Sequence, residues 1–102
     1  MSKESKLQPM KVELSIDNNV AKGVYANHLV VGHTANEFFL DFFSIAGPQG
    51  SHTARVFTSP GHMKRIINAI QDNLVRYENS FGKIKEAPEP SEGPANGYIA
   101  EN

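Results

Sequence analysis

The chain has no cysteine among its 102 residues. It can therefore form neither a disulfide nor a metal site built on thiolates. Long apolar runs are also missing: no segment approaches the roughly 18–20 apolar residues that a membrane span needs. The first residues lack the apolar stretch of a signal peptide. We therefore expect a cytoplasmic protein that does not enter a membrane.

An excess of either charge is missing too. Ten basic and eleven acidic residues give a formal net charge of −1. General nucleic-acid binders normally carry a basic excess, so we do not expect nucleic acid as the main partner, although a local basic patch stays open. Neither a glycine-flanked serine nor a phosphate-binding glycine loop occurs. We predict no catalysis and no cofactor.

The four histidines do not suggest a metal site. His28 and His33 are an odd number of residues apart, so they would face opposite sides of one strand. His52 follows a glycine turn, and His62 falls in the first turn of an expected helix. Because zinc needs three or four converging ligands, we predict that no metal is bound.

Composition divides the chain into three parts. Residues 1–9 are charged and polar, and residues 85–102 are rich in proline, glycine and acidic side chains. Such segments cannot bury enough apolar surface to offset chain entropy, so both ends are predicted to be disordered. Residues 10–84 remain as one small domain.

Alternation of apolar and polar residues predicts four strands in this domain, separated by turns at "DNN", "TANE" and "GPQG". The expected strands are Met10–Ile16, Gly23–His33, Glu37–Ala46 and His52–Thr58. If the "TANE" turn centres near Ala35, Val31 lies opposite Phe39, and Leu29 lies opposite Asp41.

The third expected strand contains "EFFLDFF", which is apolar on both faces apart from Asp41. A buried carboxylate needs a partner or solvent. Arg55 on the next strand is the first candidate, and Asn27 and Tyr25 could donate hydrogen bonds. A partner across a dimer is a further possibility.

A long helix follows the strands. Ser59 suits the N-cap, Pro60 suits the first turn, and Gly82 suits the C-terminal cap. Apolar residues recur every three or four positions and predict a core-facing stripe. This helix stripe consists of Met63, Ile66, Ile67, Ile70, Leu74, Tyr77 and Phe81. The polar side offers a possible basic contact face of Lys64, Arg65 and Arg76, which Asp72 and Glu78 dilute.

We therefore predict an α+β fold, an antiparallel meander of about four strands followed by one long amphipathic helix. One helix can cover one face of the sheet. The other face would expose an apolar patch, which monomers rarely leave open. A homodimer or higher homo-oligomer is expected to cover it. The predicted interface consists of Leu29, Val31, Phe39, Asp41 and Phe43.

The segments "VAKGVYANHLVVGHTANEFFLDF" and "ARVFTSPGHMKRIINAIQDNLVRYENSFGKI" resemble the family called domain of unknown function 3467. The resemblance covers about Val12 to Ile84 and implies a short meander followed by one helix in a small prokaryotic protein. It implies no substrate, cofactor or catalytic residue. The matching residues are Tyr25, Ala26, Asn27, His33, Glu37, Phe38, Asp41, Phe42, Arg55, Ser59, Pro60, His62, Lys64, Arg65, Asn73, Tyr77, Glu78, Phe81 and Gly82.

The expected function is a small, non-enzymatic, oligomeric binding or scaffold protein. Two other classes stay open. One is a chaperone-like polypeptide binder, because four strands and a long helix are similar in outline to the export chaperone SecB, an analogy of fold alone. The other is a nucleic-acid-associated regulator that uses the basic helix face.

Overall fold

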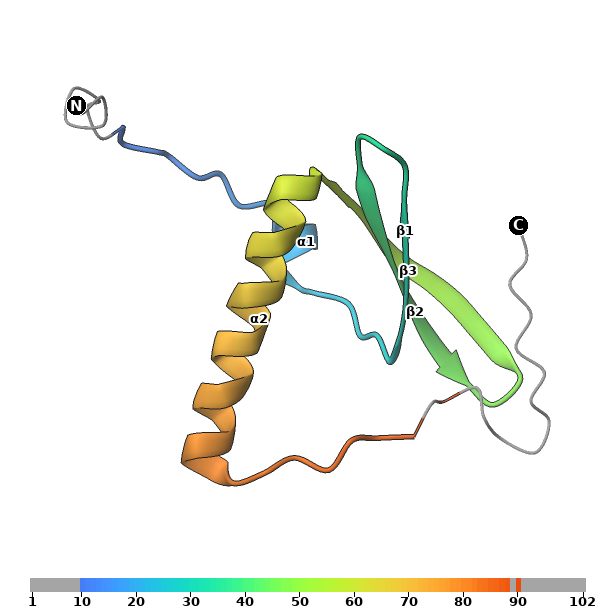
Figure 1. The fold of residues 1–102 in the computed structure, drawn as a ribbon. Helices are drawn as coiled ribbons and strands as arrows, with labels where there is room; N and C mark the ends of the chain where they lie inside the picture. Colours follow the sequence, from blue (N-terminus) through green and yellow to red (C-terminus); the bar gives the residue numbers. More distant parts are fainter. Residues whose placement is uncertain (1–9, 89, 91–102) are drawn as a thin grey trace.

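The computed structural model describes residues 10–88 and residue 90. It has the order α1 (Asn18–Ala21), β1 (His28–His33), β2 (Phe38–Ala46), β3 (Gln49–Thr58) and α2 (Pro60–Phe81). The α+β class is confirmed, as a three-stranded antiparallel meander followed by a long helix (Figure 1). Most of the predicted disorder, at residues 1–9 and 91–102, lies outside the described residues.

The loop of the first hairpin is one residue longer than expected. His33 pairs with Phe38, so four residues from Thr34 to Glu37 form the loop. The Thr34 hydroxyl accepts hydrogen bonds from the backbone N–H of Asn36 and Glu37, at 3.1 and 3.2 Å. The loop therefore centres between two residues rather than on one.

This loop changes the predicted pairing of β1 with β2. Val31 lies opposite Leu40, not Phe39, and Leu29 lies opposite Phe42, not Asp41. Both predicted pairs are wrong by one residue. Because side chains alternate along a strand, a shift of one residue moves each partner to the other face of the sheet.

The second hairpin turns through Gly47, whose φ is +60°, and Pro48. β2 pairs with β3 from Ala46 and Gln49 outward, and an irregularity interrupts the ladder between Phe42 and Phe43. Ala54 lies opposite Phe42 while His52 lies opposite Phe43, which leaves Thr53 as an extra residue in β3. This is a β-bulge.

The first predicted strand is not formed within the chain. Residues 10–16 have no strand partner among the described residues, and they run away from the sheet past the start of α2 (Figure 1). The "DNN" turn is instead the beginning of α1, where Asp17 caps the helix by accepting from Asn19 N–H at 2.8 Å. The predicted second strand begins at His28 rather than at Gly23.

α2 begins and ends as predicted. The Ser59 hydroxyl accepts from His62 N–H at 3.1 Å, and Pro60 occupies the first turn. At the other end Gly82 takes a φ of +100° and donates to the carbonyl of Glu78 at 2.9 Å. Ser59 and Gly82 thus satisfy polar groups that helix ends leave without partners.

Little of the described chain is buried. The buried apolar side chains among residues 10–88 are Leu40, Ile45 and Met63. The strands pack extensively on each other, whereas α2 makes no comparable contact with the sheet and diverges from it toward its C-terminal end (Figure 1). The expectation that the helix covers a sheet face is therefore wrong within one chain.

A close approach between Gly32 and the Phe39 ring gives a test of the sheet. A Cβ at Gly32 would collide with the ring atoms of Phe39. We expect Gly32→Val to lower the free energy of unfolding by about 1–3 kcal/mol, the usual range for an overpacked site. Urea unfolding followed by circular dichroism measures this change.

Gly61→Ala is the matched control for that substitution. Gly61 lies in the first turn of α2 with open space around its Cβ position. Alanine there should leave stability unchanged or raise it by about 0.4–1 kcal/mol. Equal stabilities for Gly32→Val and the wild type would show that the Phe39 ring does not need this space.

Candidate functional site

Each face of the sheet has a distinct character. Residues that pair across antiparallel strands share a face, and neighbours along a strand alternate. The Asp41 face carries Phe39, Asp41 and Phe43 of β2, with residues of β1 and β3 opposite them. The Leu40 face carries Leu40 and Phe42 of β2, with Leu29, Val31, Ala54 and Val56 opposite.

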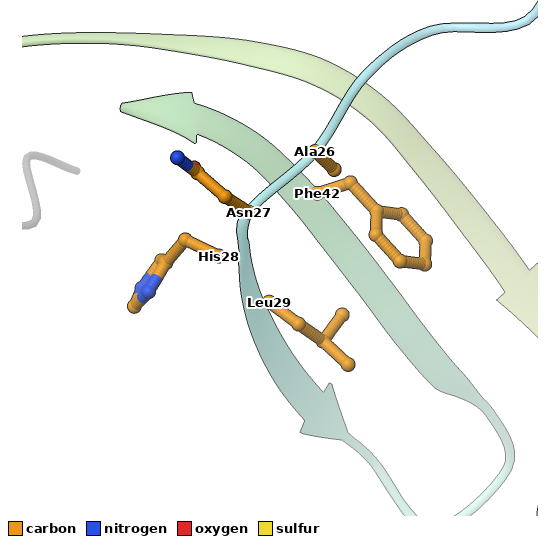
Figure 2. A pocket seen from close by; sticks show the side chains of 5 residues that line it. All are labelled: Ala26, Asn27, His28, Leu29 and Phe42. Carbon is orange, nitrogen blue, oxygen red and sulfur yellow. The ribbon is translucent and has the colours of Figure 1, made fainter. Parts of the chain in front are cut away.

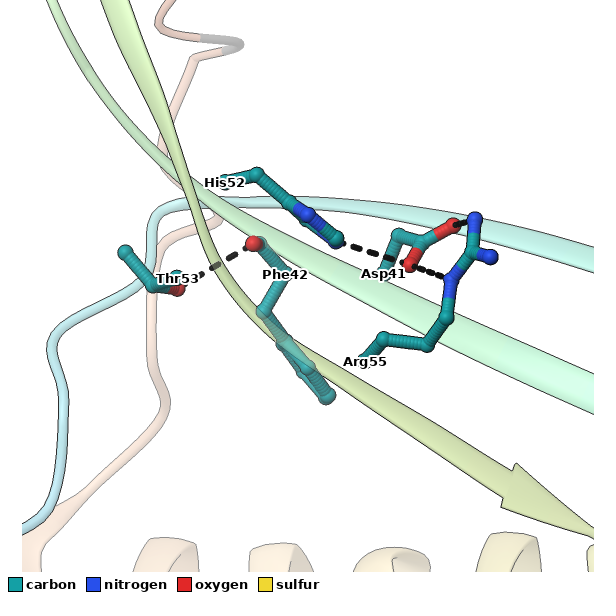
Figure 3. A network of polar contacts seen from close by, with 5 residues as sticks. All are labelled: Asp41, Phe42, His52, Thr53 and Arg55. Atoms are coloured by element: carbon teal, nitrogen blue, oxygen red, sulfur yellow. Dashed lines mark hydrogen bonds and ion pairs between the residues drawn. The ribbon is translucent and has the colours of Figure 1, made fainter.

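Asp41 is the centre of a polar cluster on its face (Figure 3). Arg55 binds its carboxylate with two nitrogens: Nε donates to Oδ1 at 2.6 Å, and Nη2 donates to Oδ2 at 2.8 Å. His52 Nε2 lies 2.8 Å from Oδ1. The predicted Arg55 pair is present, and it satisfies a residue that is 5 % exposed.

The β-bulge explains how His52 reaches Asp41. His52 and Arg55 are three residues apart, so in a regular strand they would point to opposite faces. The extra residue Thr53 shifts the pairing by one, which brings His52 opposite Phe43 and onto the Asp41 face. The Thr53 hydroxyl donates to the carbonyl of Phe42 at 3.1 Å. No pattern in the sequence indicates the contact between His52 and Asp41.

The cluster holds Asp41 in its ionised form. The hydrogen bond from Arg55 is the main cause, and the pKa of Asp41 falls from 3.8 to about 2, even though burial acts in the opposite direction. His52 adds a smaller lowering of this pKa. The same hydrogen bond raises the pKa of Arg55. Asp41 therefore carries no proton at neutral pH, and its low pKa makes it a weak base.

Arg55 is held by aromatic rings as well as by the carboxylate. Its guanidinium carbon lies 5.0 Å from the centre of the Phe39 ring and 5.8 Å from that of Phe57. These distances are within the range of cation–π attraction. Both Asp41 oxygens and two Arg55 nitrogens are thus occupied inside the protein, so the cluster fits a structural role.

The predicted hydrogen bonds from Asn27 and Tyr25 to Asp41 are not formed. The Asn27 side chain instead pairs with the backbone of Ile45: Nδ2 donates to its carbonyl, and Oδ1 accepts from its N–H, both at 2.9 Å. Asn27 directly precedes β1, and its side chain takes the place of a strand residue that would pair with β2 there. Tyr25 is exposed.

A shallow recess of about 330 Å³ lies beside this asparagine. Ala26, Asn27, His28, Leu29 and Phe42 line it. Figure 2 shows Asn27 and His28 pointing to one side of β1, and Leu29 and Phe42 to the other. The Asn27 amide is already paired with the backbone of Ile45, and the apolar side chains lie on the other side of the strand (Figure 2). The recess therefore lacks the several convergent polar groups that line a ligand pocket.

Within residues 10–88 and residue 90, no group of three or more His, Asp or Glu side chains could hold a metal ion. No helix in the same part of the chain is long and apolar enough to cross a membrane.

The residues of the predicted dimer interface are divided between the two faces. Phe39, Asp41 and Phe43 lie on the Asp41 face, while Leu29 and Val31 lie on the Leu40 face. They cannot form one continuous patch on the sheet. The one-residue error in the hairpin register is the reason, because it moved the β1 residues across the sheet.

Most of the helix stripe is exposed in the described part of the chain. Met63 is buried and Ile66 is half-buried. The five remaining side chains are between 46 % and 75 % exposed, so the stripe does not form a core within one chain. These five are Ile67, Ile70, Leu74, Tyr77 and Phe81. Tyr77 and Phe81 contact each other, with ring centres 5.0 Å apart.

The possible basic contact face is dispersed. Lys64, Arg65 and Arg76 are all exposed. At a rise of about 1.5 Å per residue, Arg65 and Arg76 stand roughly 16 Å apart along α2, and Asp72 lies between them on the same side. The three basic residues therefore do not converge on one phosphate.

Comparison with known families gives a match over residues 1–86 to "Protein of unknown function (DUF3467)". The chain belongs to the DUF3467 family. The resemblance drawn from the sequence motifs is thus confirmed. Comparisons with curated proteins and with solved structures give no match.

Because Asp41 has a lowered pKa in the folded chain, its ion pair stabilises the fold above pH 3.8, and this contribution is lost as the pH falls toward 2. We expect Asp41→Asn to be less stable than the wild type at pH 6, with the difference shrinking between pH 4 and pH 2. Unfolding midpoints in urea across this pH range measure it. Parallel curves for the two proteins would contradict the role of the carboxylate.

Proposed function

We propose that the chain is a non-catalytic binding or scaffold protein that works as a homo-oligomer, with a homodimer as its simplest form. The exposed helix stripe carries this proposal. A soluble monomer rarely exposes an apolar patch larger than a few hundred Å², and larger patches mark interfaces.

The dimensions of α2 fit this role. Its 22 residues span about 33 Å, and the stripe follows that length on one side. A stable interface buries about 800 Å² on each partner. The stripe leaves five apolar side chains 46–75 % exposed along this length, and the Leu40 face adds exposed apolar residues such as Val56.

A second copy of the chain is the simplest partner for the exposed helix stripe. Two antiparallel helices can pack their apolar stripes against each other, and a two-fold axis lets one patch serve both subunits. A cytoplasmic location remains a prediction from composition. Chaperone-like binding of unfolded polypeptide is the alternative occupant of the same surface, and the experiment below separates the two.

Ile70→Asp tests the proposal, because it places a charge in the middle of the stripe. We expect the wild type to be a dimer at micromolar concentration and the variant to be a monomer or to unfold, since an unpaired charge in an apolar interface is strongly unfavourable. Light scattering after size-exclusion chromatography measures the mass. Thermal unfolding at several protein concentrations adds a second readout, because the midpoint of a dimer depends on concentration.

Asn68→Asp is the matched control, since it introduces the same charge on the polar side of the same helical turn. It should keep the mass of the wild type. A wild type that is monomeric and has a concentration-independent midpoint would refute the homo-oligomer. If such a monomer binds unfolded polypeptide and Ile70→Asp does not, the chaperone-like alternative gains support.

A further inference from the structure

Residues 10–16, here called the arm, have the pattern of a strand but no strand partner among the described residues. Apolar and polar residues alternate along the arm, as in a half-buried strand. Yet its four apolar residues are between 73 % and 83 % exposed. These are Met10, Val12, Leu14 and Ile16.

The arm is part of the family domain, since the DUF3467 match begins at residue 1 and runs to residue 86. It also leaves the body of the protein: Figure 1 shows it passing the start of α2 and pointing away from the sheet. An extended apolar segment with this course can be covered by another molecule.

The sheet offers two outer edges. β1 and β3 each pair with β2 on one side, and no strand occupies the other side in the described part of the chain. An open edge presents unpaired N–H and C=O groups that can accept an added strand. β3 has ten residues and β1 has six, so only β3 can pair with all seven residues of the arm.

Charge also favours pairing of the arm with β3 rather than with β1. Glu13 is the acidic residue on the polar side of the arm, and Arg55 lies in the middle of β3 with its side chain 48 % exposed. If Glu13 lies opposite Arg55, the carboxylate meets this guanidinium. Opposite charges on directly paired residues stabilise a sheet.

The same register places the apolar residues of the arm correctly. With Glu13 on the Asp41 face, Val12 and Leu14 lie on the Leu40 face. There they extend the apolar surface of Ala54 and Val56, and Val56 is 45 % exposed in the single chain. Leu14 pairs with Ala54 if the arm is antiparallel to β3, and with Val56 if it is parallel.

We propose that the arm of one copy adds as a fourth strand to the β3 edge of a second copy, so that the protomers exchange their N-terminal strands. This inference rests on the proposed homo-oligomer and specifies how it is built. The exchange converts the three-stranded sheet into four strands and covers the apolar side of the arm.

Disulfide trapping tests the exchange without interference, because the chain has no cysteine of its own. Leu14→Cys protein is mixed with Ala54→Cys or with Val56→Cys protein and then oxidised. We expect a covalent heterodimer with one of these two partners, which also assigns the strand direction. Ser15→Cys, on the other side of the arm, is the control and should give little product with either partner.

A chain that carries Leu14→Cys together with the matching β3 cysteine distinguishes exchange from folding back. Closure of a disulfide within one chain at high dilution would show that the arm pairs with its own sheet and would overturn the exchange. Absence of any disulfide in all mixtures would overturn the assignment to β3.

Hydrogen exchange gives a second measurement on the full chain. Leu14→Asp should raise the exchange rates of the β3 amides by about tenfold or more relative to Ser15→Asp, because it removes the burial of one leucine. Unchanged hydrogen exchange of the β3 amides in a Leu14→Asp dimer would refute the addition of the arm to β3. Dissociation by Ile70→Asp would still support the homo-oligomer. The two proposals can therefore fail separately.

Discussion

A buried carboxylate in the middle strand constrains the strand that follows it. Asp41 is 5 % exposed, and its partners Arg55 and His52 both come from β3. If β3 slipped by one residue, the side chains of these partners would move to the other face and leave the charge without compensation. The ion cluster thus specifies the register of the second hairpin.

Local chemistry accounts for the parts of the fold that the sequence predicts. Ser59, Pro60 and Gly82 act at the ends of α2 through their own backbone preferences, so the helix bounds follow without knowledge of the remaining structure. The pairing of Asp41 with Arg55 follows from a tight turn and a charge that needs a partner. The register of the first hairpin and the bulge at Thr53 do not follow, because loops of three and four residues fit the same "TANE" sequence.

Periodicity indicates which side of an element is apolar, but not what covers it. The arm and the helix stripe both have the pattern of buried elements, and both are largely exposed in the single chain. The difference arises because burial depends on neighbours, and periodicity does not indicate whether these belong to the same molecule. The residues of the predicted dimer interface are separated for a related reason: a one-residue error in register divided the five between two faces.

The meander also determines the order in which the protein can assemble. Each strand pairs with its neighbour in the sequence, through a loop of four residues or a turn of two, and α2 forms from contacts one turn apart. Contacts this local require little loop closure and form fast. If the chain forms the proposed homo-oligomer, the protomer can acquire its hairpins and helix before it meets another chain, and association is then the concentration-dependent step. The rate of maturation would then depend on how much of the protein the cell makes.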